Sequence, residues 1–376
     1  MATKFLECGG DATFNVATTT AGGFWALVGG TPTVATDFVH GAHIKSIKYR
    51  TANQDYVRSP AVLQDSGSRI SFYLYLNALP STTSTFMNAA NSGNTLNIFF
   101  FKMTSAGVLQ LWDSNNAAQI GTNGSTLSTG IWYQISLAYT ITSTTVNRFE
   151  QFVNGISSIS ITNATLQNTG TSNFQPGNID SNATLDMRMS DIYVDNSSSL
   201  TDPGNIWVTA KRPNANGTTN GFSTQIGAGG SGYGTGHSPQ VNERALSNTN
   251  GWSMIGAGSA VTEEYNIESK STGDIDISTA TIVDWLGWVD IKSLAGETVQ
   301  IILNGANTAQ AITSTETLYT AIKGSATYPA GTGADIGVIT DTSLTTVNLY
   351  ECGVVVAYIP AVASTKKFLS LMGVGT

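Results

Sequence analysis

The chain has 376 residues and a formal net charge of −8 at pH 7, and only 11% of its residues are charged. Nucleic acids and anionic membranes are bound through basic patches, so this composition argues against both as partners. Its 7 Trp, 13 Tyr and 14 Phe residues exclude a disordered chain, and a polarity carried by Ser, Thr, Asn and Gly favours strands and turns.

Strand patterns recur roughly every ten to fifteen residues in the first third of the chain. The clearest is residues 69–76, in which Ile70, Phe72, Leu74 and Leu76 alternate with serine and tyrosines. Further strands are expected at residues 24–28, 42–49, 97–101 and 108–113. This spacing is typical of a β-sandwich rather than of alternating strands and helices.

The middle of the chain repeats this period-two pattern without any helical period. Residues 130–139 alternate, and residues 148–153 and 157–161 flank an Asn154-Gly155 hairpin turn. In residues 191–195, the side chains of residues 192 and 194 are expected to point inward. Asp191, Tyr193 and Asp195 are expected to point outward.

These residues carry a resemblance. A Gly-x-Trp-Tyr-x-Ile-x-Leu strand from Gly130, a strand ending in Val153-Asn154-Gly155 and the Asp-Ile-Tyr-Val-Asp strand from Asp191 resemble, in this order, the concanavalin A-like jelly roll of laminin-G, lectin and glucanase domains. They are most similar to its form in tailed-bacteriophage virion proteins. There the last strand precedes a polar loop, a strand with a basic residue before proline and an Asn-Gly turn, here residues 196–217.

The resemblance and the patterns together predict an all-β chain with two units. A concanavalin A-like jelly roll is expected at residues 1–225 and a glycine-rich linker at 226–250. A smaller β-sandwich is expected at 251–361, followed by a C-terminal tail at 362–376. Apolar residues of this tail suggest docking on a neighbouring subunit, and packing on its own domain is the alternative.

The two cysteines, Cys8 and Cys352, cannot form a disulfide framework and are expected to be free thiols of a reducing cytosol. One bridge between them is the alternative. The first residues lack an apolar stretch of the kind found in secretory signals. The late apolar run at 353–359 is too short to span a membrane and is expected to be a buried strand.

The sequence offers few candidates for a pair of catalytic carboxylates. Retaining glycosidases hold two carboxyl groups about 5–5.5 Å apart. The nearest pattern, Asp274-Ile-Asp276, lacks a third acid and is interpreted as the solvent-facing side of an edge strand. Asp191 and Asp195 are ~13 Å apart along their strand, too far for an acid and base pair.

Histidine also gives no predicted site. His40 and His43 would need a helix to place both imidazoles on one side, and their surroundings predict strand and turn. The remaining histidine is His237. No metal and no other cofactor is therefore predicted. Calcium is left open, since lectin-like jelly rolls sometimes bind it, but a dense acidic loop does not occur here.

With no catalytic or metal site predicted, glycan binding is the remaining function. Aromatic rings can stack on the C–H faces of sugars, while Asn and Asp side chains can bind sugar hydroxyl groups. The predicted residues are Trp112, Asp113, Asn115 and Asn116, together with Trp132 and Tyr193. For each aromatic residue, packing in the core or at a sheet edge is the alternative.

The resemblance implies a non-enzymatic bacteriophage virion structural protein: an external capsid, fibre or tail component that is made in the host cytoplasm. Its expected partners are other virion proteins, copies of itself in a homo-oligomer and host-surface carbohydrate, with no nucleic acid and no membrane insertion. One alternative is a capsid decoration or head-fibre protein without a ligand. A glycan-cleaving enzyme is the other alternative.

Overall fold

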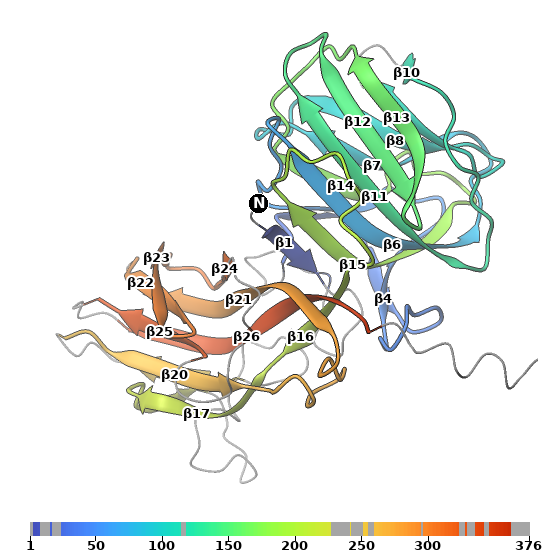
Figure 1. The fold of residues 1–376 in the computed structure, drawn as a ribbon. Coiled ribbons are helices and arrows are strands. Elements are labelled where there is room, and N and C mark those ends of the chain that lie inside the picture. Colours follow the sequence, from blue (N-terminus) through green and yellow to red (C-terminus); the bar gives the residue numbers. More distant parts are fainter. Residues whose placement is uncertain are drawn as a thin grey trace, which may run out of the picture.

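The computed structural model describes residues 3–7, 16, 24–113, 118–226, 241, 251–254, 259–294, 296–322, 328, 335–341 and 346–361. Within these ranges every named element is a β-strand, and every strand pair is antiparallel. The strands form two sandwiches, each of two sheets (Figure 1). The prediction of an all-β chain, a jelly roll followed by a smaller β-sandwich, is confirmed.

The first sandwich contains an eight-stranded and a seven-stranded sheet. The eight-stranded sheet has the order β13 (Ile156–Ala164), β12 (Asn147–Val153), β11 (Trp132–Ile141), β6 (Ser68–Ala78), β15 (Asp186–Asp195), β4 (Ser46–Tyr49) and β3 (Thr33–Ala35), with β1 (Thr3–Glu7) also paired to β15. The seven-stranded sheet has the order β10 (Ala118–Ile120), β9 (Leu109–Asp113), β8 (Asn97–Met103), β7 (Ser84–Ala90), β14 (Asn173–Asn178), β5 (Asp55–Arg58) and β2 (Leu27–Gly29).

The second sandwich contains a six-stranded and a five-stranded sheet. The first of these has the order β18 (Thr224–Ile226), β19 (Gly251–Met254), β26 (Val347–Ile359), β21 (Thr281–Ser293) and β24 (Thr317–Ile322), with β16 (Trp207–Lys211) also paired to β26. The other has the order β17 (Pro213–Asn220), β20 (Thr262–Ile267), β25 (Ile336–Thr340), β22 (Thr298–Leu303) and β23 (Ala306–Ala311).

The period-two pattern decides which side chains face the core. In β6 the predicted alternation holds: Ile70, Phe72, Leu74 and Leu76 are buried in the main hydrophobic cluster. The side chains between them face the other side of the sheet, because successive residues of a strand alternate. This outward face of the eight-stranded sheet carries the candidate functional site.

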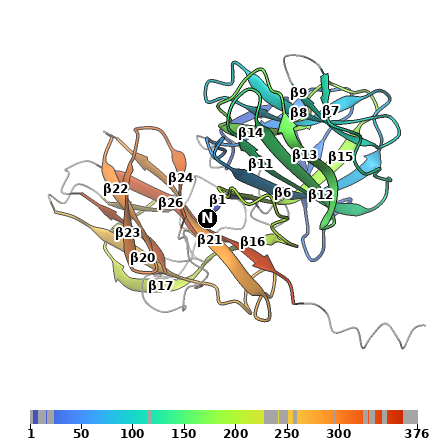
Figure 2. The same cartoon turned by 45° about the horizontal axis from the view of Figure 1, so that its top comes forward.

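The two sandwiches share part of one core. The main cluster joins residues of the first sandwich to Leu286, Trp288, Leu318, Val355 and Ala357 of the second. Both views show β1 and β16 where the sandwiches meet, and β1 contacts β16, β21 and β26 (Figures 1 and 2). Hydrophobic burial across this junction holds the two units together.

The pairing of β16 and β17 differs from the domain limits expected from the sequence. Both strands precede residue 225, yet β16 pairs with β26 and β17 with β20 of the second sandwich. The residue pattern of a strand indicates which of its faces is buried, but not which sheet it joins. The assignment of β16 and β17 to the second sandwich therefore depends on their pairing in the folded chain. Apart from residues 226 and 241, the predicted linker lies outside the described residues, as does the tail at 362–376.

Two further sequence-based expectations concern the thiols and the late apolar run. Cys352 is a free, buried thiol, and burial raises its pKa well above the ordinary value. Cys8 lies outside the described residues. Residues 353–359 lie in the buried strand β26, as predicted. In the part of the chain that the structure describes, no helix has the length and apolarity needed to cross a bilayer.

Candidate functional site

The residues predicted to bind glycan lie on two different sheets. Trp112 and Asp113 are in β9 of the seven-stranded sheet, whereas Trp132 is in β11 and Tyr193 in β15 of the eight-stranded sheet. Asn115 and Asn116 lie outside the described residues. The structure therefore does not bring the predicted residues together, and their binding role stays a prediction.

Trp112 is half-buried at the end of β9. Its indole Nε1 donates to Gln110 Oε1 at 3.0 Å, and the Lys102 ammonium lies 4.4 Å from the ring centroid. Asp113 is buried beside a surface hollow of about 410 Å³, which β10 and the end of β13 also line. Tyr193 is only 2% exposed and donates its hydroxyl proton to Asp195 at 2.8 Å. The Tyr193 side chain is therefore buried, and its hydroxyl group is hydrogen-bonded inside the protein.

Trp132 belongs to a larger group of rings on the outward face of the eight-stranded sheet. We call this group the aromatic cluster; its members are Phe38, His40, Tyr73, Tyr75, Trp132 and Trp207. Tyr73 and Tyr75 alternate with the core residues of β6, and Trp132 is the cross-strand partner of Tyr75. Such pairs stack readily because opposite side chains of neighbouring strands lie close.

Ring contacts run through the whole aromatic cluster. Phe38 stacks on Tyr75 with centroids 4.5 Å apart, and Tyr75 lies 5.5 Å from Trp132. His40 stacks on Tyr73 at 3.7 Å and lies 5.4 Å from Trp132 and 4.4 Å from Trp207. Tyr73 and Tyr75 are 7% and 8% exposed, whereas the rings of Phe38, Trp132 and Trp207 are partly open to solvent.

Polar groups border the aromatic cluster. Trp207 Nε1 donates to Asn205 Oδ1 at 3.0 Å, and the Tyr73 hydroxyl donates to the same oxygen. Burial is the main cause that raises the pKa of Tyr73, so this phenol stays protonated at neutral pH. Gln134 is the cross-strand partner of Tyr73, and its amide bonds the carbonyl of Gly204.

His40, a member of the aromatic cluster, also meets His43 at the carboxylate of Asp191. His40 Nδ1 donates to Asp191 Oδ2 and His43 Nε2 to Asp191 Oδ1, both at 2.8 Å. The backbone N–H of Val208 donates to Asp191 Oδ1 at 2.7 Å. Burial disfavours the charged carboxylate, but His43 and His40 outweigh this cost and hold the pKa of Asp191 well below its usual range.

Local backbone features make this meeting possible. Asp191 has a φ of 55° at a bulge of β15, where the register with β6 shifts between Ser190 and Tyr193. Aspartate tolerates this left-handed region better than most residues. Gly41 has a φ of 58° in a turn whose His43 N–H donates to the His40 carbonyl at 3.1 Å.

The expectation that the two histidines need a helix to share a side is wrong. A glycine turn brings both imidazoles onto one carboxylate. Gly41, which lies between the two histidines, is the sequence feature from which this turn could have been predicted. Their partner Asp191 is 148 residues away from His43 in the sequence, and no local pattern points to it.

The other carboxylates considered as catalytic candidates are Asp274, Asp276 and Asp195. Asp274 and Asp276 are exposed in a loop, not in an edge strand, and Asp276 Oδ1 accepts a bond from the Ser278 N–H at 2.8 Å. The alternating exposure that suggested a strand is present, since Ile275 and Ile277 are buried, but strand pairing is not. Asp195 instead binds Arg69 in a buried ion pair at 2.5 Å.

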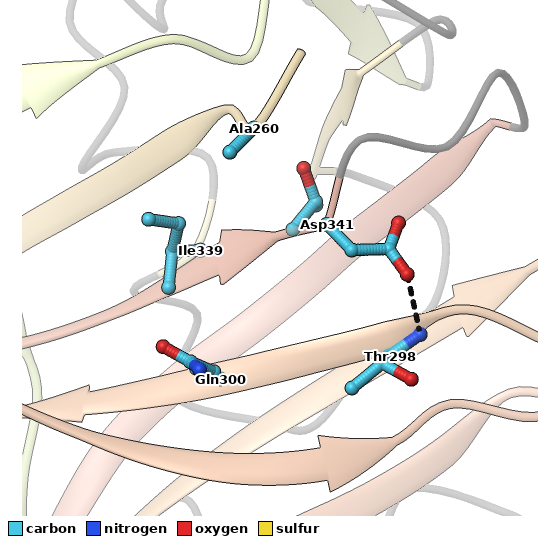
Figure 3. Close-up of a pocket in the computed structure, with 6 residues that line it drawn as sticks. Ala260, Thr298, Gln300, Ile339 and Asp341 are labelled. Atoms are coloured by element: carbon cyan, nitrogen blue, oxygen red, sulfur yellow. Dashed lines mark hydrogen bonds between the residues drawn. The ribbon is translucent and has the colours of Figure 1, made fainter. Parts of the chain in front are cut away.

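A cavity of about 210 Å³ lies in the second sandwich (Figure 3). Its lining consists of Ala260, Thr298, Gln300, Ile339, Thr340 and Asp341. Asp341 Oδ2 accepts a long bond from the Thr298 N–H at 3.4 Å. The lining lacks aromatic rings and carries one acid, so we consider the outward face of the eight-stranded sheet the better candidate site.

No protein-family model and no curated protein matches the chain. Among solved structures, an endo-β-1,4-glucuronan lyase from the fungus Trichoderma reesei is 12% identical with a TM-score of 0.39, covering 54% of this chain and 98% of its own. The cellulose-induced protein Cip1 is 14% identical, with a TM-score of 0.36 and coverage of 46% and 87%. A Trypanosoma rangeli sialidase is 13% identical, with a TM-score of 0.34 and coverage of 45% and 28%.

These findings correct two predictions. The similar structures include a fungal glucuronan lyase and a Trypanosoma rangeli sialidase, and they give no link to a bacteriophage. The assignment as a bacteriophage virion structural protein is therefore withdrawn, and so is the statement that the chain is not an enzyme. The likeness to these structures extends to the β-sandwich fold alone.

Proposed function

We propose that this protein binds a glycan on the outward face of its eight-stranded sheet, with the aromatic cluster as the platform. The observation that carries this proposal is the continuous set of ring contacts from Phe38 to Trp207, with three of the rings partly open to solvent. Partly exposed aromatic rings offer apolar faces to the C–H groups of a sugar.

Polar groups beside the rings complete the chemistry that a sugar requires. The amides of Asn205 and Gln134 lie at the border of the aromatic cluster, and the carbonyl of Gly204 lies next to them. A few placed polar groups among apolar ones are typical of small-ligand sites. We also assign the first sandwich to the concanavalin A-like type of jelly roll, supported by its motifs from Gly130 to Asp195, and that superfamily includes lectins.

The test is a glycan array on the purified chain, followed by calorimetric titration with the best ligand. Trp132→Ala should weaken binding at least ~10-fold, since each 1.4 kcal/mol is a factor of ten and a stacked ring supplies roughly that much. Trp112→Ala is the comparison variant, because it removes an indole from the opposite sheet, where the sequence had predicted binding. A site on the aromatic cluster requires that its affinity stay unchanged.

Two results would contradict the proposal. One is a glycan array without any bound sugar. The other is a loss of affinity in Trp112→Ala but not in Trp132→Ala, which would move the site to β9 and its neighbouring hollow. Self-association stays a prediction, because the tail on which it was based lies outside the described residues.

A further inference from the structure

We propose that His40, His43 and Asp191 bind one divalent transition-metal ion, with Zn²⁺ as the best fit. Each residue offers one ligand atom, and these atoms all lie within 4.8 Å of one another. Imidazole nitrogen suits zinc, copper and nickel, whereas calcium and magnesium prefer all-oxygen sites. The proposal does not rest on glycan binding.

The distances fit a site that needs only small side-chain movements. Both imidazole nitrogens lie 2.8 Å from carboxylate oxygens of Asp191. In zinc sites the ligand atoms lie about 2.0–2.2 Å from the metal, so tetrahedral ligands are roughly 3.3 Å apart. The short nitrogen–oxygen contacts would therefore open by roughly 0.5 Å, while the three ligand atoms, which all lie within 4.8 Å of one another, draw together around the ion.

The surroundings resemble the outer shell of a metal site. All three side chains are buried, with His40 and His43 only 7% and 3% exposed. The Val208 N–H fixes Asp191 Oδ1, and the Tyr73 ring covers the His40 imidazole. Backbone donors and packed rings of this kind orient metal ligands, and a water molecule would complete a four-coordinate site.

Charge balance gives the metal a role. Asp191 is fully buried, and its carboxylate is balanced in the structure by its hydrogen bonds to the two imidazoles. A buried carboxylate needs a counter-charge. A divalent ion held between the three side chains would supply that counter-charge directly.

The position of the site adds a consequence for stability. His40 and His43 lie between β3 and β4, Asp191 lies in β15, and Val208, which bonds Asp191, lies in β16. Strand β16 pairs with β26 of the second sandwich. A metal ion bound here holds the junction of the two sandwiches, so it should stabilise the folded chain against heat.

The experiment uses the full chain without a histidine tag. The protein is treated with a chelator, dialysed against a low concentration of ZnCl₂, and analysed for bound zinc by elemental mass spectrometry. We expect one zinc ion per chain and a higher midpoint of thermal unfolding. His43→Ala and His40→Ala should each weaken zinc binding by about 100-fold. Loss of an outer-shell partner typically weakens metal binding 10–100-fold, and loss of a direct ligand should cost at least as much.

His237→Ala is the matched control, because it removes the third histidine of the sequence and should leave zinc binding unchanged. Should the His43 or His40 variant not fold, the visible spectrum of Co²⁺ added to the unchanged protein decides the question. Intense absorption typical of four-coordinate nitrogen and oxygen ligands supports the proposal. A spectrum of hydrated cobalt, no bound zinc, or equal zinc loss in His237→Ala would overturn it.

Discussion

Asp290 provides a direct test of the electrostatics inside the second sandwich. It lies on β21, is 1% exposed, and its Oδ1 has no hydrogen-bond partner among the described residues. Burial raises the pKa of Asp290 to about 8, and the charge of Glu316 adds to the rise. Glu351 is its cross-strand neighbour on β26. The carboxyl group is therefore protonated in the folded chain at neutral pH.

The direction of the pH dependence follows from the two protonation states. The unfolded chain releases this proton near pH 3.8, whereas the folded chain keeps it up to about pH 8. The stability that this group contributes is fully present below pH 3.8 and is lost as the pH rises through 8. Each pH unit changes the unfolding free energy by up to about 1.4 kcal/mol. Over the three pH units between pH 5 and pH 8, we therefore expect a loss of about 2–4 kcal/mol of unfolding free energy.

Asp290→Asn keeps the shape of the protonated acid and removes the titration. Urea unfolding of both proteins at pH 5, 6, 7 and 8 should give similar free energies of unfolding at pH 5 and a growing advantage for the variant above it. Asp276→Asn is the control, since hydrogen bonds from Ser278 lower the pKa of that exposed carboxyl group and it does not titrate in this range. Parallel pH curves for Asp290→Asn and the unchanged protein would refute the reasoning.

Three further predictions concern the junction and the sheet face. Arg69→Met leaves the buried Asp195 charge unpaired and should cost about 3–5 kcal/mol of unfolding free energy, part of which Arg69→Met/Asp195→Leu should recover in urea unfolding. Gly41→Ala places a Cβ 2.1 Å from the Trp207 ring at a φ of 58° and should cost about 1–3 kcal/mol, with an altered indole fluorescence spectrum as the local readout. Leu286→Ala should cost about 2–5 kcal/mol, and calorimetry should show both sandwiches unfolding in one transition at a lower temperature.

Much of the fold could be predicted because buried and exposed residues alternate along a strand, and this alternation is visible in the local sequence. The alternation of β6 and β11 identified the core side of the eight-stranded sheet, and the Asn154-Gly155 turn between β12 and β13 was readable from two residues. The partners of β16 were not predictable in this way. Its pattern fits either sandwich, and only its pairing with β26 places it in the second.

The candidate site was predicted only in part, for a related reason. Trp132 was predicted as a binding residue, but its ring neighbours come from distant segments: Tyr75 from β6 and His40 from the connection before β4. Trp207 of β16 joins the cluster through its contact with His40. Trp112 was predicted together with Asp113, Asn115 and Asn116, which follow it in the sequence. Local composition selected a single loop, whereas the rings that gather in the structure are brought together by strand order.

The strand β16 connects the site to the rest of the molecule. Its first residue, Trp207, contacts His40 in the first sandwich and Tyr358 in the second, and the Val208 N–H holds Asp191. The aromatic cluster and the two histidines therefore keep their arrangement only while β16 stays paired to β26. A ligand on the platform or a metal ion below it would favour the same packed junction. Binding at this face should thus be coupled to the stability of both sandwiches, although the rings that contact the ligand lie mostly on one of them.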